Sequence, residues 1–107
     1  MTIHELQKLA YSIAKANGFH ERDKNKAVVW NDPARVPALL MLSVSELAEA
    51  LEAFRRNDPA NFIEELADTI IRICDTAETL NMNLEHAIIK KCKRNKVRGY
   101  KHGGKRI

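Results

Sequence analysis

The 107-residue sequence contains few of the residues that a β-sheet protein needs. Glycine occurs four times, and aromatic residues make up 6% of the chain, which disfavours an all-β design and favours helices. No apolar run approaches the roughly 20 residues that a helix needs to span a bilayer, and the N-terminal residues show no signal-peptide pattern. We therefore expect a helical, cytoplasmic protein with no membrane partner.

Cysteine is also scarce. Cys74 and Cys92 lie far apart and form no CxxC pattern, which disfavours a zinc site. Each falls on the apolar side of an expected helix, so we expect two buried, reduced thiols. The length suits a single domain spanning residues 1–107, whose modest core leaves room for a partner subunit to supply part of it.

Charge is divided unevenly along the chain. Nine of the 18 Lys and Arg residues lie in residues 90–107, which contain no acid. The other nine bases and all 14 acids lie in residues 1–89, which therefore carry a net charge of −5. An acidic body with a basic end is typical of a protein that binds phosphate, either in nucleic acid or in a nucleotide.

Apolar periodicity and capping signals predict four helices joined mostly by short turns. The first is expected from Thr2, which forms a capping box with Glu5, to Gly18. The second begins near Asp32-Pro33 or near Pro37 and runs to about Arg56. The third is capped by Asp58, begins at Pro59 and runs to about Leu80. The fourth is capped by Asn83, runs to about Lys96 and precedes a basic tail at about 97–107. These elements predict an all-α fold of antiparallel helices resembling a four-helix bundle.

Residues 19–36 break this periodicity and form a long connection, a kind of segment that is often functional. It contains Trp30, the only tryptophan. Two interpretations stay open: Trp30 plugs the mouth of the bundle, or it offers a flat surface to a nucleobase.

The second helix is apolar nearly all round. One stripe contains Leu40, Val44, Leu47, Leu51 and Phe54. Glu46 and Glu49 lie on a second strip, together with Leu39, Leu42, Ala50 and Ala53. A helix of this kind should be largely covered, and acids on a covered strip need a compensating charge.

The third helix carries another pair of acids. Glu65, Asp68 and Arg72 share one face, so an ordinary surface ion pair between Asp68 and Arg72 is one interpretation. The other follows from the hairpin that the second and third helices should form, which brings Glu46 and Glu49 close to Glu65 and Asp68. Four converging acids cannot all stay ionised without a cation, and hard carboxylate oxygens suit Mg²⁺ or Mn²⁺.

The fourth helix places Lys91 and Asn95 on the same face as Leu84, Ile88 and Cys92. In one interpretation Lys91 extends its ammonium group to solvent and Asn95 lies in a frayed end. In the other, the two polar groups reach phosphate oxygens beside the metal.

Three segments together resemble a known family. The acids in "SELAEAL" and "FIEELADTI", followed by "KCKRNKVRGYKHGGKRI", are similar to the ExxE…ExxD and KxxxNxxR…HGGK motifs of the MazG-like all-α nucleoside triphosphate pyrophosphohydrolases. The resemblance covers roughly residues 36–107. The sequence departs from the family at Ser45, where many members have glutamate, and at Gly99, where proline often follows the arginine.

The resemblance implies a function and a set of site residues. It identifies Glu46, Glu49, Glu65 and Asp68 as metal ligands, and Lys91, Asn95 and Arg98 as binding the triphosphate. The implied reaction is Mg²⁺-dependent hydrolysis of a nucleoside triphosphate to the monophosphate and pyrophosphate. Water activated by the metal attacks the α-phosphorus, and Glu46 or Glu49 orients or deprotonates that water. Members of the family form dimers or dimers of dimers, so we expect a homo-oligomer.

Two rivals come from other functional classes. A helical nucleic-acid-binding module would account for the basic tail and the high sequence pI, but acids on covered helix strips give it no benefit and an acidic body repels a duplex. A bundle that acts only in protein interactions would retain the motifs without catalysis. The base and sugar of the substrate stay open.

Overall fold

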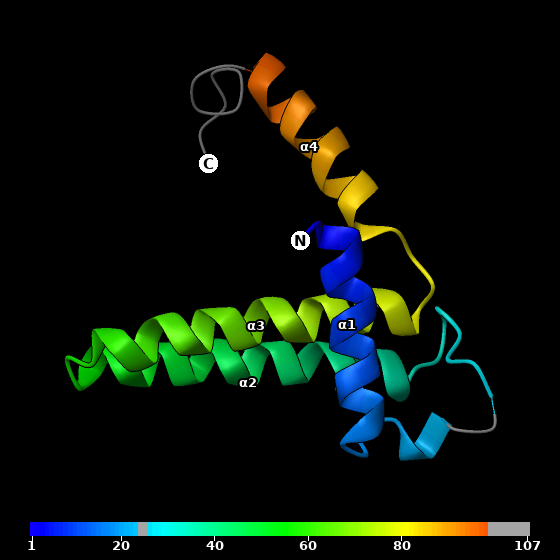
Figure 1. Cartoon of the computed structure of the whole chain (residues 1–107), viewed down its shortest axis with the longest axis horizontal. Helices are drawn as coiled ribbons and strands as arrows, with labels where there is room; N and C mark the ends of the chain where they lie inside the picture. The colour runs from blue at the N-terminus through cyan, green and yellow to red at the C-terminus, as the bar shows by residue number, and fades with distance from the viewer. Residues whose placement is uncertain (24–25, 99–107) are drawn as a thin grey trace.

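The computed structural model describes residues 1–23 and 26–98 (Figure 1). These residues form four α-helices and a single turn of 3₁₀ helix, and they contain no strand. The elements are α1 (Ile3–Ala16), η1 (Glu21–Asp23), α2 (Arg35–Arg55), α3 (Pro59–Thr79) and α4 (Leu84–Arg98). The expected all-α fold is confirmed, while most of the expected basic tail, residues 99–107, lies outside the described residues.

The predicted N-terminal caps are present. The amide of Glu5 donates to Thr2 Oγ1 over 3.0 Å, and the amide of Thr2 donates back to Glu5 Oε1 over 2.9 Å. Asp58 accepts from the amide of Asn61, and Asn83 accepts from the amide of His86. Such side-chain acceptors satisfy amides that the first turn of a helix leaves unpaired.

The start of α2 lies between the two predicted positions. Oδ1 of Asp32 accepts hydrogen bonds of 2.9 Å from the amides of Ala34 and Arg35. The carboxylate of Asp32 therefore caps these amides from three residues before the helix begins, and Pro37 falls within the first turn.

Three helices end through a residue in the left-handed region, with φ of 85° at Gly18, 57° at Asn57 and 54° at Asn81. After α2, the amide of Asp58 donates to the carbonyl of Ala53 over 2.9 Å, which is the long bond of a Schellman motif. Asn57 thus stops α2, and the next residue already caps α3. This short turn makes α2 and α3 an antiparallel hairpin, as the sequence predicts.

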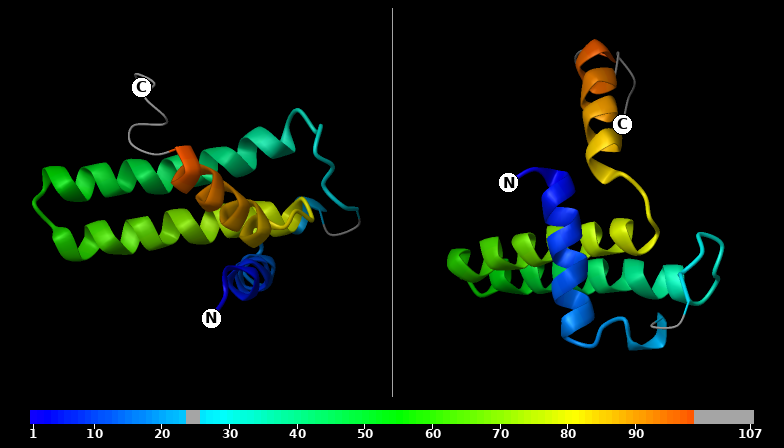
Figure 2. Two further views of the ribbon diagram at one scale, coloured as in Figure 1. Left: turned by 90° about the horizontal axis from the view of Figure 1, so that it is seen from above. Right: turned by 45° about the vertical axis from the view of Figure 1, so that its right-hand side comes forward.

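The helices do not close into a compact bundle. Figures 1 and 2 show α1 running across the hairpin, with α3 between α2 and α1. The fourth helix packs on α1 and projects away from the hairpin. The radius of gyration is 16.1 Å, whereas a compact domain of this length has about 13 Å.

Only one of the two apolar strips on α2 is buried. Leu39, Ala50 and Ala53 are buried, because this strip faces the other helices. The other strip, which we call the α2 apolar face, comprises Leu40, Val44, Leu47, Leu51 and Phe54. Its side chains are 49–72% exposed. The expected coverage of the whole helix is therefore not reached within one chain.

The two cysteines differ. Cys74 is buried, as expected, and burial raises the pKa of its thiol. The expectation for Cys92 is wrong: its side chain is exposed, because α4 extends beyond the rest of the described chain. None of the helices in the described part of the chain has the length and apolarity needed to cross a membrane.

Candidate metal centre

Three of the four expected ligands come together on the α2–α3 hairpin. Glu46, Glu65 and Asp68 each offer one carboxylate oxygen, and these oxygens all lie within 4.8 Å of one another. We call this set the acid cluster. Glu46 is held there because it follows the spacing of the buried strip of α2, residues 39, 46, 50 and 53. Its carboxylate therefore faces α3 instead of open solvent.

The contribution of α3 also follows from helical spacing. Glu65, Asp68, Arg72 and Asp75 lie three, four and three residues apart and so share a face. Exposure falls along this face, from an exposed Asp68 to Asp75, which is 2% exposed. The acid cluster thus marks the outer end of a polar row that continues into the protein.

Desolvation and neighbouring negative charges both act on Glu65. Its pKa is raised, first by desolvation and then by the negative charges of Glu46, Asp68 and Glu49. A hydrogen bond with Asp68 adds to the effect, because it favours the protonated form of Glu65. The site consequently holds more negative charge than the chain itself balances at this position.

Glu49 lies at the edge of the site. Its side chain is exposed, and it is not one of the three residues whose oxygens converge. Its charge nevertheless contributes to the raised pKa of Glu65. Glu52, one turn further along α2, is different: it pairs with Arg55 over 2.6 Å in solvent.

Arg72 supplies a positive charge to the cluster. Its Nε lies 3.5 Å from Oε1 of Glu46, and its guanidinium group stacks over the ring of Phe19, 4.2 Å from the ring centre. The surface pair of Arg72 with Asp68 is therefore not what the structure shows: Arg72 pairs with an acid on the neighbouring helix. The guanidinium group of Arg72 therefore links the hairpin to Phe19, in the segment that follows α1.

A cavity of about 300 Å³ adjoins the acid cluster. Glu46, Asp68 and Arg72 form part of its wall, α1 and Phe19 form another part, and Asp75 lines it as well. The cavity joins the cluster to a mostly apolar recess, so a ligand can contact the acids and an apolar surface at the same time.

A buried polar network that sequence analysis did not predict supports this cavity. His20 is 4% exposed, and its Nε2 lies 2.7 Å from Oδ1 of Asp75. Its Nδ1 lies 3.4 Å from Asp23, which forms a 3.0 Å ion pair with Arg35. The network ties the connection after α1 to α2 and α3. Only the position of Asp75 on the Glu65–Asp68 face gave any signal of it.

The expected substrate-binding residues lie away from the cluster within one chain. Lys91, Asn95 and Arg98 are exposed on α4, which projects from the hairpin (Figure 1). Trp30 is 69% exposed and so does not plug the described helices. Within one chain, the structure therefore brings three of the acids together but leaves Lys91, Asn95 and Arg98 apart from them.

The orientation of α4 is set at its first turn by a buried amide. The side chain of Gln7, which is 2% exposed, donates to the carbonyl of Met82 and accepts from the amide of Leu84 over 3.2 Å. It also donates to Glu78 over 2.9 Å. One residue of α1 thereby fixes the end of α3 relative to the start of α4.

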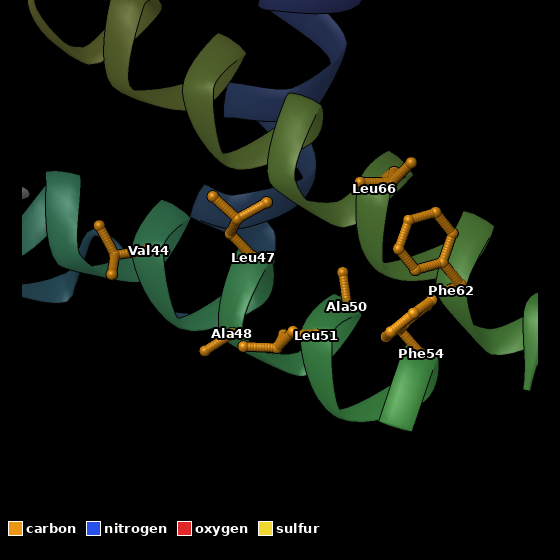
Figure 3. Close-up of a pocket in the computed structure, with 8 residues that line it drawn as sticks. All are labelled: Val44, Leu47, Ala48, Ala50, Leu51, Phe54, Phe62 and Leu66. Atoms are coloured by element: carbon orange, nitrogen blue, oxygen red, sulfur yellow. The ribbon is translucent and has the colours of Figure 1, made fainter. Parts of the chain in front are cut away.

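The hairpin also carries an apolar groove of about 440 Å³ (Figure 3). It is lined by Val44, Leu47, Ala48, Ala50, Leu51 and Phe54 of α2 and by Phe62 and Leu66 of α3. The groove includes most of the α2 apolar face. Its lining lacks the polar groups that fix a nucleotide or a metal, so it has the character of a surface for packing.

No protein-family model matches the chain, and neither a curated protein nor a solved structure is significantly similar to it.

Proposed function

We propose that the chain is a Mg²⁺-dependent nucleoside triphosphate pyrophosphohydrolase, with Mn²⁺ as a possible substitute metal. The observation that carries the proposal is the convergence of the Glu46, Glu65 and Asp68 carboxylates within 4.8 Å. The reaction itself comes from the resemblance of the acid motifs and the basic ending to the MazG-like family. Products would be the nucleoside monophosphate and pyrophosphate.

The donor set fits a hard divalent ion. Each ligand is a carboxylate, as Mg²⁺ and Mn²⁺ prefer. The pKa of Glu65 is raised by desolvation and then by neighbouring acids, whose repulsion a cation would relieve. Glu46, Glu65 and Asp68 would hold the ion, and the charge of Glu49 at the edge of the site would add to its attraction. The bound ion would neutralise phosphate charge and acidify water.

The chain's own residues would then position the substrate. Glu46 or Glu49 orients the attacking water or takes its proton. Arg72 offers a planar guanidinium group, well suited to phosphate oxygens, beside Glu46. Lys91, Asn95 and Arg98 would reach the same phosphates only if they came from α4 of another subunit, or if α4 took a different position.

We therefore include a homo-oligomer, either a dimer or a dimer of dimers, in the proposal. Support comes from the α2 apolar face, which is 49–72% exposed around the groove of Figure 3. Exposed apolar surface of this extent on a short chain favours association.

The reaction is tested by incubating the full chain with a panel of nucleoside triphosphates and Mg²⁺. Pyrophosphate and a monophosphate are the expected products. Release of phosphate with a diphosphate as co-product would show that the α-phosphorus assignment is wrong. No turnover of any nucleotide with Mg²⁺ or Mn²⁺ would remove the enzyme proposal altogether.

The rival function as a nucleic-acid-binding module has one observation in its favour. No residue of α4 is buried, and the helix presents several Lys and Arg side chains to solvent. A module of that kind would bind nucleic acid with a steep dependence on salt and without metal. Metal-independent binding together with absent turnover would favour it over hydrolysis.

A further inference from the structure

The cavity beside the acid cluster contains a feature that bears on the identity of the substrate. We propose that this cavity receives the base of the nucleotide, and that Asp75 selects between bases by one ring substituent. Bases with an exocyclic amino group would bind better than bases with a keto group at the same ring position. Cytosine and adenine would be preferred to uracil and hypoxanthine. The inference rests on the proposed function for its substrate class, but the selecting group is independent of the metal ligands.

One carboxylate oxygen of Asp75 is hydrogen-bonded within the protein and the other is free. Its Oδ1 lies 2.7 Å from Nε2 of His20 and accepts from the hydroxyl of Thr79 over 3.4 Å. Its Oδ2 accepts no hydrogen bond from any described residue. Asp75 is 2% exposed and lines the cavity, so the free oxygen belongs to a side chain that is otherwise enclosed.

The free oxygen is not sealed inside the protein. The fully buried, unpaired side-chain atoms among the described residues are Nδ1 of His4 and Oγ of Ser43, and Oδ2 of Asp75 is not one of them. Because Oδ2 lacks a partner among the described residues and Asp75 lines the cavity, we place this oxygen towards the cavity. A ligand in that cavity is positioned to supply the missing hydrogen bond.

The chemistry of a carboxylate determines which ligands satisfy this oxygen. An ionised carboxylate only accepts hydrogen bonds. An exocyclic amino group donates one, whereas a keto oxygen at the same position would face a like partial charge and leave Oδ2 desolvated and unpaired. Sites with buried polar groups reject the mismatched analogue strongly, because the unpaired group carries the cost of its lost hydration.

The rest of the cavity suits a flat, largely apolar ring. Ile13 of α1 and Ile71 of α3 line it together with the ring of Phe19. Its volume of about 300 Å³ lies at the lower end of the range for small-molecule sites. Since Glu46 and Asp68 also line it, a base bound against Asp75 leaves the phosphates on the side of the acid cluster.

Nucleosides test the inference without metal or catalysis. Methyl NMR spectra of the full chain, with labelled isoleucine, are recorded while cytidine, uridine, adenosine or inosine is added. We expect shifts at Ile13 and Ile71, with binding at least about tenfold tighter for cytidine than uridine and for adenosine than inosine, a difference worth ~1.4 kcal/mol. Equal affinities within each pair, or no shifts with any nucleoside, would overturn the proposal.

Two substitutions with a matched control locate the site. Ile71→Trp should fill the cavity and weaken cytidine binding by at least about tenfold. Ile73→Trp is the control, because Ile73 is 42% exposed against 41% for Ile71 and does not line the cavity. Equal loss of binding in both variants would place the nucleoside elsewhere.

Asp75→Asn tests the selecting group. An amide both donates and accepts, so the preference for cytidine over uridine should collapse towards equality while uridine binding is retained. An unchanged preference in a folded Asp75→Asn protein would overturn the role of Asp75. Because nucleosides carry no phosphate, these outcomes are separate from the pyrophosphate assay: selective nucleoside binding without turnover refutes the hydrolase and keeps the base site.

Discussion

At the residue scale, Glu65 links the acid cluster to stability. Its folded-state pKa is raised, above all by desolvation, so the folded protein binds this proton more tightly than the unfolded chain does. The resulting stability is fully present below the unfolded pKa of Glu65 and is lost as pH rises through the folded pKa. Ionised Glu65 therefore destabilises the metal-free protein at neutral pH.

Glu65→Gln should accordingly raise the melting temperature of the metal-free protein at pH 7 and make no such difference at low pH. Thermal melts over a pH series, in the presence of a chelator, measure this. Glu52→Gln is the control, because Glu52 lies in solvent and pairs with Arg55. A Glu65→Gln protein that melts lower than wild type at pH 7 without metal would contradict the account of the cluster.

Loss of a ligand should have the opposite effect once metal is present. A metal at 100 times its Kd stabilises the folded state by about 2.7 kcal/mol, because it binds only the assembled site. Asp68→Asn should lose most of this Mg²⁺-induced rise in melting temperature and lower kcat/KM by about 100-fold or more. Glu49→Gln should also abolish turnover if this acid handles the attacking water. Near-normal activity in Asp68→Asn would exclude it as a ligand.

Individual site residues were predictable to different degrees. Glu46, Glu65 and Asp68 were found because acids at hairpin spacing approach one another when the turn is short, whereas Glu49 lies at the edge of the site. The partner of Arg72 was not predicted from the sequence. The i, i+4 spacing within a helix favours Asp68 and carries no information about Glu46 on the neighbouring helix. The His20–Asp75 contact joins residues 55 apart, and only tertiary packing of the connection creates it.

At the scale of the elements, local signals determined the helices and their ends. Capping residues and left-handed stops predicted the boundaries because they act within a few residues of the chain. Which of the two apolar strips of α2 is buried could not be predicted from such local signals. Small residues such as Ala50 and Ala53 allow close approach, so their strip packs, and the larger side chains of the α2 apolar face stay outside.

The position of α4 depends on Gln7. Gln7→Ala should cost about 1–3 kcal/mol of unfolding free energy, because it leaves the Met82 carbonyl and the Leu84 amide without their partner in a partly buried place. Urea denaturation measures the loss. Lys8→Ala is a suitable comparison: its side chain is 60% exposed and its pair with Glu78 is 3.6 Å long, so it should cost at most about 1 kcal/mol. Equal effects would remove the special role of Gln7.

At the scale of the whole molecule, an extended shape and an uncovered apolar face predict self-association. Wild type should be a dimer or a dimer of dimers by light scattering at micromolar concentration. Leu51→Glu, which places a charge in the groove of Figure 3, should shift the protein towards monomer. Ile63→Glu should not, because Ile63 is exposed on α3 but does not line the groove. A monomeric wild type would refute the prediction.

The central claim is that the acid cluster binds metal in order to hydrolyse a nucleoside triphosphate at the α-phosphorus. The most direct measurement is the product of turnover by wild type in water enriched in ¹⁸O, with Mg²⁺ and with a chelator. The account predicts pyrophosphate free of label and a monophosphate carrying one ¹⁸O, formed only when Mg²⁺ is present. Label in released phosphate or pyrophosphate, or equal turnover with the chelator, would contradict it.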